Sequence, residues 1–119
     1  MNLQTFYEKV GGNYTEVLSR LISDRLITKF LLKFPDDPSY AVLSVSIDHE
    51  DYEEAFRAAH TLKGVCLNLG LSNLAQNATA LTELLRSANG QVDQEQLITL
   101  MNQIKKEYVI VVDAIPGLM

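Results

Sequence analysis

The sequence predicts an all-α protein: an antiparallel up-and-down four-helix bundle with additional N-terminal helical segments. Apolar residues recur at intervals of three and four over most of the chain, which is the period of amphipathic helices. Glycines and prolines fall between these stretches, and the connections between the longer stretches are short, which favours antiparallel neighbours. With 119 residues, 47% of them apolar, the chain has enough material for one core. We therefore predict a single domain over residues 1–119.

The first third of the chain is expected to contain shorter helices. Residues 3–10 are predicted to form one helix, and residues 14–34 a second one that Pro35 ends. The apolar spacing of the second range slips around Ser23 and Asp24, so this range can also be two helices with a bend.

The segment after Pro38 is predicted to be a helix, because proline suits the first turn of a helix. The many β-branched side chains of residues 40–47 would also permit a strand. We discount the strand because the sequence offers it no partner. The buried face of this helix is expected to consist of Ala41, Val42, Val45 and Ile47.

The clearest helix spans about residues 50–69, where apolar residues follow a strict 3-4-3-4-3 spacing. Asp48 is the expected N-cap, and Gly70 is the expected stop after the last turn. The predicted buried seam is Tyr52, Ala55, Ala59, Leu62, Cys66 and Leu69.

Two more helices are predicted at about residues 72–88 and 94–114. Ser72 or Asn73 is expected to cap the first, which Asn89-Gly90 should end. Asp93, with Gln96 three residues later, resembles a capping box for the second. The predicted seams are Leu74, Ala78, Leu81, Leu85 and Ala88 in the first helix, and Leu97, Leu100, Met101, Ile104, Tyr108 and Val111 in the second.

Charge and composition narrow the function. The formal net charge is −5, which argues against binding to nucleic acid or to an anionic membrane. The one cysteine, Cys66, cannot form an internal disulfide and fits a reducing compartment. We see no signal-like apolar stretch at the N-terminus and no run near the roughly 20 apolar residues that span a bilayer. We expect a cytoplasmic monomer.

His60 is predicted to face away from the bundle. Each residue advances about 100° around a helix, which places His60 roughly 130° from the centre of the buried seam. The residues three, four or seven positions away surround it on the helix surface. They are Glu53, Phe56, Arg57, Lys63, Gly64 and Leu67. Phe56 and Leu67 are expected to form a small apolar patch where a partner docks.

This strip suits phosphoryl chemistry. A neutral imidazole nitrogen is a nucleophile near neutral pH. Lys63, one turn later, can bind phosphoryl oxygens. Gly64 has no side chain, so another protein can approach closely, although a glycine within a helix costs about 1 kcal/mol relative to alanine. The alternative interpretations are an ordinary surface histidine, a solvated lysine, and a glycine that lets two helices pack closely.

The run Ala58-Ala59-His60-Thr61-Leu62-Lys63-Gly64-Val65-Cys66-Leu67-Asn68-Leu69-Gly70 resembles the signature of the histidine-containing phosphotransfer (HPt) family. That signature has an accepting histidine, then lysine three, glycine four and glycine ten residues later. Here these residues are His60, Lys63, Gly64 and Gly70. The resemblance covers about residues 24–112, the expected core bundle.

The resemblance implies a phosphocarrier of bacterial two-component phosphorelays rather than an enzyme. His60 would exchange a phosphoryl group, on Nε2, with the aspartate of a response-regulator receiver domain. A hybrid histidine kinase is a further partner that the resemblance permits. The chain itself would need no cofactor, because the receiver supplies Mg²⁺ and most catalytic groups. Phosphoryl transfer mainly needs positioning and charge neutralisation, which the chain and the receiver would supply together.

One departure from the family concerns how the imidazole is oriented. Many members have a glutamine or glutamate on the following helix that bonds to the accepting ring. Thr82 aligns with that position here, and Glu83 and Gln76 are the other candidates. Two other functions stay open: a non-catalytic module that binds receivers, and the phospho-accepting domain of a chemotaxis-type kinase, phosphorylated in trans.

Overall fold

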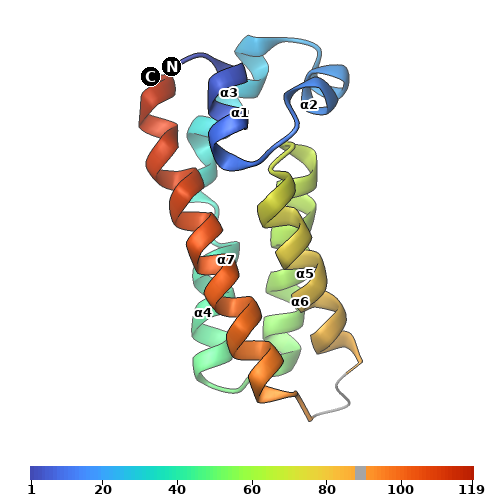
Figure 1. Ribbon diagram of the computed structural model, residues 1–119. Helices are drawn as coiled ribbons and strands as arrows, with labels where there is room; N and C mark the ends of the chain where they lie inside the picture. The colour runs from blue at the N-terminus through green and yellow to red at the C-terminus, as the bar shows by residue number, and fades with distance from the viewer. Residues whose placement is uncertain (88–90) are drawn as a thin grey trace.

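The computed structural model describes residues 1–87 and 91–119, and every regular element within them is helical (Figure 1). The molecule is elongated, with principal extents of 43 × 23 × 20 Å. In chain order the described elements are α1 (Leu3–Val10), α2 (Tyr14–Leu21), α3 (Asp24–Lys33), η1 (Phe34–Asp36), α4 (Ser39–Asp48), α5 (Tyr52–Asn68), α6 (Ser72–Arg86), α7 (Gln94–Ala114) and η2 (Ile115–Leu118).

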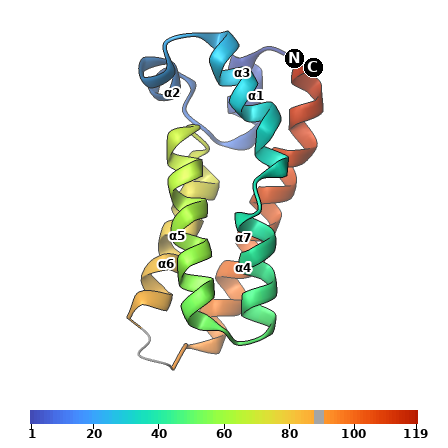
Figure 2. The ribbon, with the colours of Figure 1, turned by 180° about the vertical axis from the view of Figure 1, so that it is seen from behind.

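The helices α4 to α7 form an antiparallel bundle in which the chain direction alternates from one helix to the next (Figures 1 and 2). α5 packs against both α4 and α6, and α7 packs against α6. The ring of Tyr40 on α4 stacks on that of Tyr108 on α7, with 4.0 Å between the ring centroids, and so joins the first bundle helix to the last. The predicted fold class is confirmed.

The N-terminal helices cover the end of the bundle at which both termini lie (Figure 1). The hydroxyl of Tyr7 donates a buried hydrogen bond of 2.6 Å to the carbonyl of Leu69, at the end of α5. The amide of Asn13 donates to the carbonyl of Gly70, at 2.9 Å. These bonds tie α1 and the start of α2 to the end of α5. The range 14–34 forms two helices, the second of the two arrangements that its spacing permits.

The seam of α5 agrees with prediction. Ala55, Ala59, Leu62 and Cys66 are buried, and Tyr52 at the start of the seam is half-buried. The predicted N-cap is wrong: Asp48 is the last residue of α4, and Asp51 accepts the capping bond from the amide of Glu54. The chain reverses its direction between α4 and α5, and residues 49–51 form this turn. α5 therefore begins only at Tyr52. Gly70 has a φ of 68°, so it forms the expected left-handed stop.

The corrected cap gives a test with an internal control. Asp51→Ala should lower the free energy of unfolding by about 1 kcal/mol, because the amide of Glu54 loses its acceptor. Asp48→Ala, which removes a carboxylate without a capping role, should change it by less than about 0.5 kcal/mol. Denaturant titration of both variants measures the difference, and equal effects would contradict the assignment of the cap.

The ends of α6 and α7 differ in how well the sequence predicts them. Neither Ser72 nor Asn73 caps α6, since Leu71 is the N-cap residue and makes no side-chain capping bond. Asp93 caps α7 as expected, accepting from the amide of Gln96. α6 ends at Arg86; the expected stop at Asn89-Gly90 and the seam residue Ala88 lie outside the described residues. The rest of the α6 seam is buried; in α7, Leu97, Ile104 and Val111 are buried, and Leu100, Met101 and Tyr108 are half-buried.

The predicted buried face of α4 is wrong. Ala41, Val42 and Val45 are exposed and Ile47 is half-buried, whereas Ser39, Leu43 and Ser46 are buried. This helix is apolar around most of its circumference, so its own pattern does not select a face. The buried serine side chains are small, and the distance between packed helices depends on the side chains at the contact, so α4 can approach its neighbours closely on this face. The segment is helical, which excludes the strand.

The thiol of Cys66 and the hydroxyl of Tyr7 are buried in their protonated forms. Burial raises the pKa of the Cys66 thiol to about 12 and raises the pKa of the Tyr7 hydroxyl well above its ordinary value. The unfolded chain loses these protons at ordinary values, near pH 8.5 for a thiol. Their contribution to stability is therefore complete below about pH 8 and is lost as the pH rises toward the folded-state values.

We therefore expect the free energy of unfolding to fall between pH 8 and pH 11. Denaturant titrations across this range measure it. Cys66→Ala, which removes the thiol, should be less stable at pH 7 but should lose less stability on going to pH 10 than the parent chain. An identical pH dependence for the two proteins would contradict the role of the thiol.

Candidate functional site

His60 lies in the middle of α5 with its side chain exposed to solvent. The neighbouring Ala59 and Leu62 are buried in the bundle, so the pitch of the helix turns His60 outward. The predicted orientation is confirmed. Because α5 packs on both α4 and α6, the histidine stands on a helix that two neighbours hold in place. Figure 2 shows α5 in front of the bundle.

An aromatic ring and a cation lie on the α6 side of the histidine. The rings of Phe56 and His60 meet edge to face, with 6.2 Å between centroids and 82° between planes. The guanidinium of Arg86, at the end of α6, lies 5.4 Å from the centroid of the Phe56 ring. Sequence reasoning missed Arg86, because no spacing within α5 indicates which residue of the next helix will stand beside Phe56.

Gly64 and Lys63 occupy the next turn of the strip. A Cβ placed on Gly64 would meet nothing within 4 Å, so close helix packing does not explain this glycine. Lys63 is half-buried, and among the described residues it has no carboxylate partner within ion-pair distance. Its ammonium charge is thus available to an incoming anion. The two residues place a cation and an open surface within one turn of the histidine.

The other strip residues are exposed or already paired. Arg57 forms ion pairs with Glu53 at 3.1 Å and with Glu54 at 2.6 Å. Its charge is therefore offset within α5 before any partner arrives. Phe56 is half-buried, and Leu67 keeps 48% of its surface exposed. Both residues thus keep some apolar surface exposed, and their role as a docking patch stays a prediction.

Thr82 does not orient the imidazole. Its side chain is fully buried and its hydroxyl donates to the carbonyl of Ala78, at 2.7 Å, one turn back along α6. Glu83 is exposed and lies 3.5 Å from the guanidinium of Arg86. Gln76 is also exposed. No residue in the described part of the chain makes a hydrogen bond to the His60 ring, so the orienting roles of Glu83 and Gln76 stay predictions.

The described ranges contain neither a candidate metal site nor a candidate membrane-spanning helix. Over residues 1–87 and 91–119, no three acidic, cysteine or histidine side chains are grouped so as to hold a metal ion. In the same ranges none of the helices combines the length and the apolar character that a bilayer span requires.

A comparison with protein families places the strip within a known domain. A family model described as Hpt domain matches residues 25–109. This range covers most of the chain, includes His60, Lys63, Gly64 and Gly70, and nearly coincides with the expected core at 24–112. Comparisons with curated proteins and with solved structures gave no match.

Proposed function

The chain belongs to the Hpt domain family, and on that premise we propose that it carries a phosphoryl group on His60 between the proteins of a two-component phosphorelay. Hpt domains are phosphotransfer modules that work with response-regulator receiver domains. The observation that carries the proposal is the exposed imidazole of His60 beside the open surface of Gly64.

The proposed step is an in-line displacement at phosphorus. The Nε2 lone pair of the neutral His60 ring attacks the phosphoryl group on the receiver's aspartate. The new N–P bond forms as the O–P bond to the aspartate breaks, and the bonding electrons leave with the carboxylate. The Nδ1 proton stays on the ring. The reverse reaction loads a receiver from phosphohistidine.

Such a transfer needs positioning and charge compensation more than covalent chemistry from the carrier. α5, packed on two helices, supplies a firm position for the ring. Lys63 would offset the charge of the phosphoryl oxygens, and Gly64 would let the receiver's backbone approach. We propose that the receiver holds the Mg²⁺, since a receiver's phospho-accepting pocket carries the carboxylates that this ion prefers.

The experiment is phosphotransfer profiling. Each member of a panel of phosphorylated receiver domains is incubated with the chain, and label is followed on the chain by gel and by mass spectrometry. We expect fast transfer from one or a few receivers and an acid-labile phosphohistidine at residue 60. Binding without label would favour a non-catalytic interaction module.

A second arm tests the kinase-domain alternative. The chain is incubated with ATP and a histidine kinase core in place of a phosphorylated receiver. Label that appears only with the kinase and ATP, and is never exchanged with a receiver loaded beforehand, would contradict the relay role and favour a domain phosphorylated in trans.

A further inference from the structure

Two parallel stripes occupy the outer surface of α3. Arg25, Lys29 and Lys33 follow one another at intervals of four and form a basic stripe. Leu26 and Phe30 lie beside them, one position further along the chain, and keep 37% and 40% of their surface exposed. Ile22, in the turn before α3, is 84% exposed and adds apolar surface near the N-terminal end of the helix. The helix therefore offers charge and apolar surface together.

The basic stripe is unpaired in an acidic protein. In the part of the chain that the structure describes, the ion pairs of Arg20, Arg57 and Arg86 are all made within their own helices. Among residues 1–87 and 91–119, no carboxylate forms an ion pair with any of the three cations of the α3 stripe. The formal net charge of the whole chain is −5. Asp24 lies in the first turn of α3, and Asp36 and Asp37 follow the helix, so the positive field is confined to the stripe itself.

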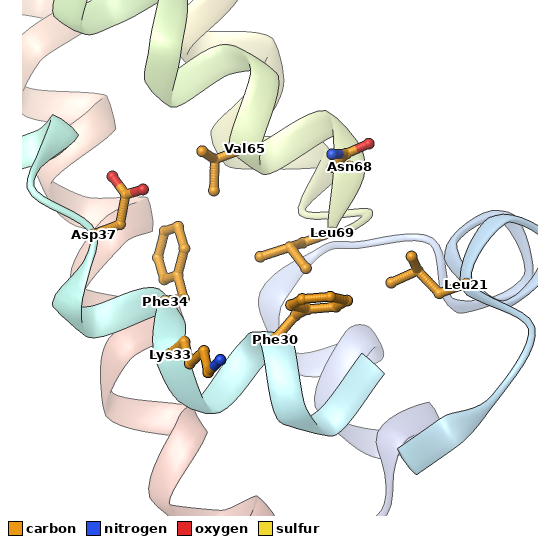
Figure 3. A pocket seen from close by; sticks show the side chains of 8 residues that line it. All are labelled: Leu21, Phe30, Lys33, Phe34, Asp37, Val65, Asn68 and Leu69. Atoms are coloured by element: carbon orange, nitrogen blue, oxygen red, sulfur yellow. The ribbon is translucent and has the colours of Figure 1, made fainter. Parts of the chain in front are cut away.

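Phe30 of the apolar stripe lines a cavity between α3 and the end of α5 (Figure 3). The cavity has a volume of about 310 Å³, enough for one or two large side chains of a partner. The rings of Phe30 and Phe34 stand on one side of it, and Val65 and Leu69 of α5 stand on the other. Lys33 of the basic stripe and Asp37 both line this cavity, so its rim carries one charge of each sign.

The turn that presents Ile22 is strained. Ile22 has a φ of 71° and a ψ of −31°, and the amide of Ser23 donates to the carbonyl of Leu21 at 2.8 Å across it. This is close to the classic γ-turn, a rare and strained conformation. A β-branched residue is especially unfavourable at positive φ. The positive φ of Ile22 therefore lowers folding stability at a position whose apolar side chain is exposed. A contact between Ile22 and a partner would explain the strained backbone and the exposed side chain.

We propose that the α3 face, defined as Ile22, Arg25, Leu26, Lys29, Phe30 and Lys33, is the second half of the receiver-docking surface. This proposal rests on the proposed function. The His60 strip, that is His60 and the six residues around it on α5, contains only seven residues. A specific protein interface takes about 20–30 residues from each partner. Asn68, which lines the cavity, lies four residues after Gly64 of the strip and so neighbours it on the surface of α5. The two surfaces therefore meet along α5.

The chemistry of a receiver matches this face. A protein that binds Mg²⁺ beside an accepting aspartate needs several carboxylates in one place, so its docking surface carries a negative potential. The cations of α3 would attract it from a distance and speed encounter, an effect that salt screens. The cavity would then take an apolar side chain of the receiver, and the exposed Ile22 would add a separate apolar contact.

The test uses paired charge reversals and the receiver that the profiling identifies. The double variant Arg25→Glu/Lys29→Glu is compared with Lys105→Glu/Lys106→Glu, which makes the same change of net charge on exposed residues of α7. α7 lies in front in Figure 1, whereas α3 lies in front in Figure 2, the opposite view. We expect the α3 variant to lower kcat/KM for transfer by about tenfold at low salt, through KM, and the α7 variant to change it little.

Two further measurements separate docking from a purely structural role: the salt dependence of transfer, and the KM of the variant Ile22→Gly. The difference between the two double variants should shrink as the ionic strength rises from about 0.05 M to 0.5 M. Ile22→Gly relieves the positive φ, so the midpoint of thermal unfolding should stay equal or rise, while KM for the receiver rises at every salt concentration. Higher KM without lower thermal stability separates docking from folding.

The outcomes distinguish failure of the α3 face from failure of the proposed function. Equal kcat/KM for the α3 and α7 variants, with normal transfer to His60, would overturn the α3 face and leave the proposed function intact. Wild-type chain that accepts no label from any receiver would contradict the proposed function, and the α3 face with it. Binding of the chain to vesicles of phosphatidylserine, lost in the α3 variant while transfer is unchanged, would reassign the face to a membrane surface.

Discussion

His60→Gln should abolish phosphoryl acceptance and leave the fold nearly unchanged. Glutamine has no nucleophilic lone pair comparable to that of imidazole, so the N–P bond cannot form. The native side chain is exposed, and no hydrogen bond to its ring is present in the described residues, so the free energy of unfolding should change by less than about 0.5 kcal/mol. Labelling from a phosphorylated receiver measures the first effect, and denaturant titration measures the second.

The sequence supplies a matched control. His49, the other of the two histidines, is exposed at the end of α4. It is not followed by lysine and glycine at the positions that Lys63 and Gly64 occupy after His60. His49→Gln should be labelled as fast as the unmodified chain. Residual label on His60→Gln, or a marked loss of helical signal in it, would mean that the phosphoryl group goes elsewhere or that His60 supports the fold.

Gly64→Gln should slow transfer by about a hundredfold while the chain stays folded. A side chain at this position would stand in open space one turn from His60, where we propose that the receiver's backbone approaches. Holding the reacting atoms about 1 Å too far apart is enough for such a loss. Single-turnover transfer from the phosphorylated receiver measures the rate. The same bulk added at Ala80, an exposed position on α6, is the control and should have little effect.

Gly64→Ala separates the helical cost of the glycine from its role in docking. The position lies within α5 with room for a Cβ, so alanine should raise the free energy of unfolding by up to about 1 kcal/mol. Transfer should slow, but less than in Gly64→Gln. A more stable chain that transfers at the original rate in both variants would leave the glycine without explanation.

The sequence determined most of the helical architecture because the signals involved are local. The strict spacing of α5 fixed which residues are buried, and therefore that His60 faces solvent. Asp93 and Gly70 acted as helix signals where predicted, since a cap depends on residues within one turn. The motif around His60 also predicted the family that the comparison found.

Predictions that depended on a neighbouring helix were less secure. The face of α4 was wrong because an almost uniformly apolar helix is oriented by what it packs against, here with Ser39 and Ser46 inward. The sequence predicted Asp48 as the cap of α5, but the connection from α4 includes that residue in α4 and leaves Asp51 to accept the capping bond. Thr82 aligned with an orienting residue, yet packing turned it into the core, where its hydroxyl bonds to its own helix.

By itself, the sequence determined an all-helical bundle and an exposed histidine followed by a lysine and a glycine, and the structure showed that the space around that glycine is open. Only the tertiary structure decided what stands around that histidine: Arg86 against Phe56 from α6, and the cavity that α3 forms with the end of α5. The physical reason is that periodicity specifies which side of a helix is buried, whereas the contacts between helices depend on how whole surfaces fit together, and no spacing within one helix encodes that fit.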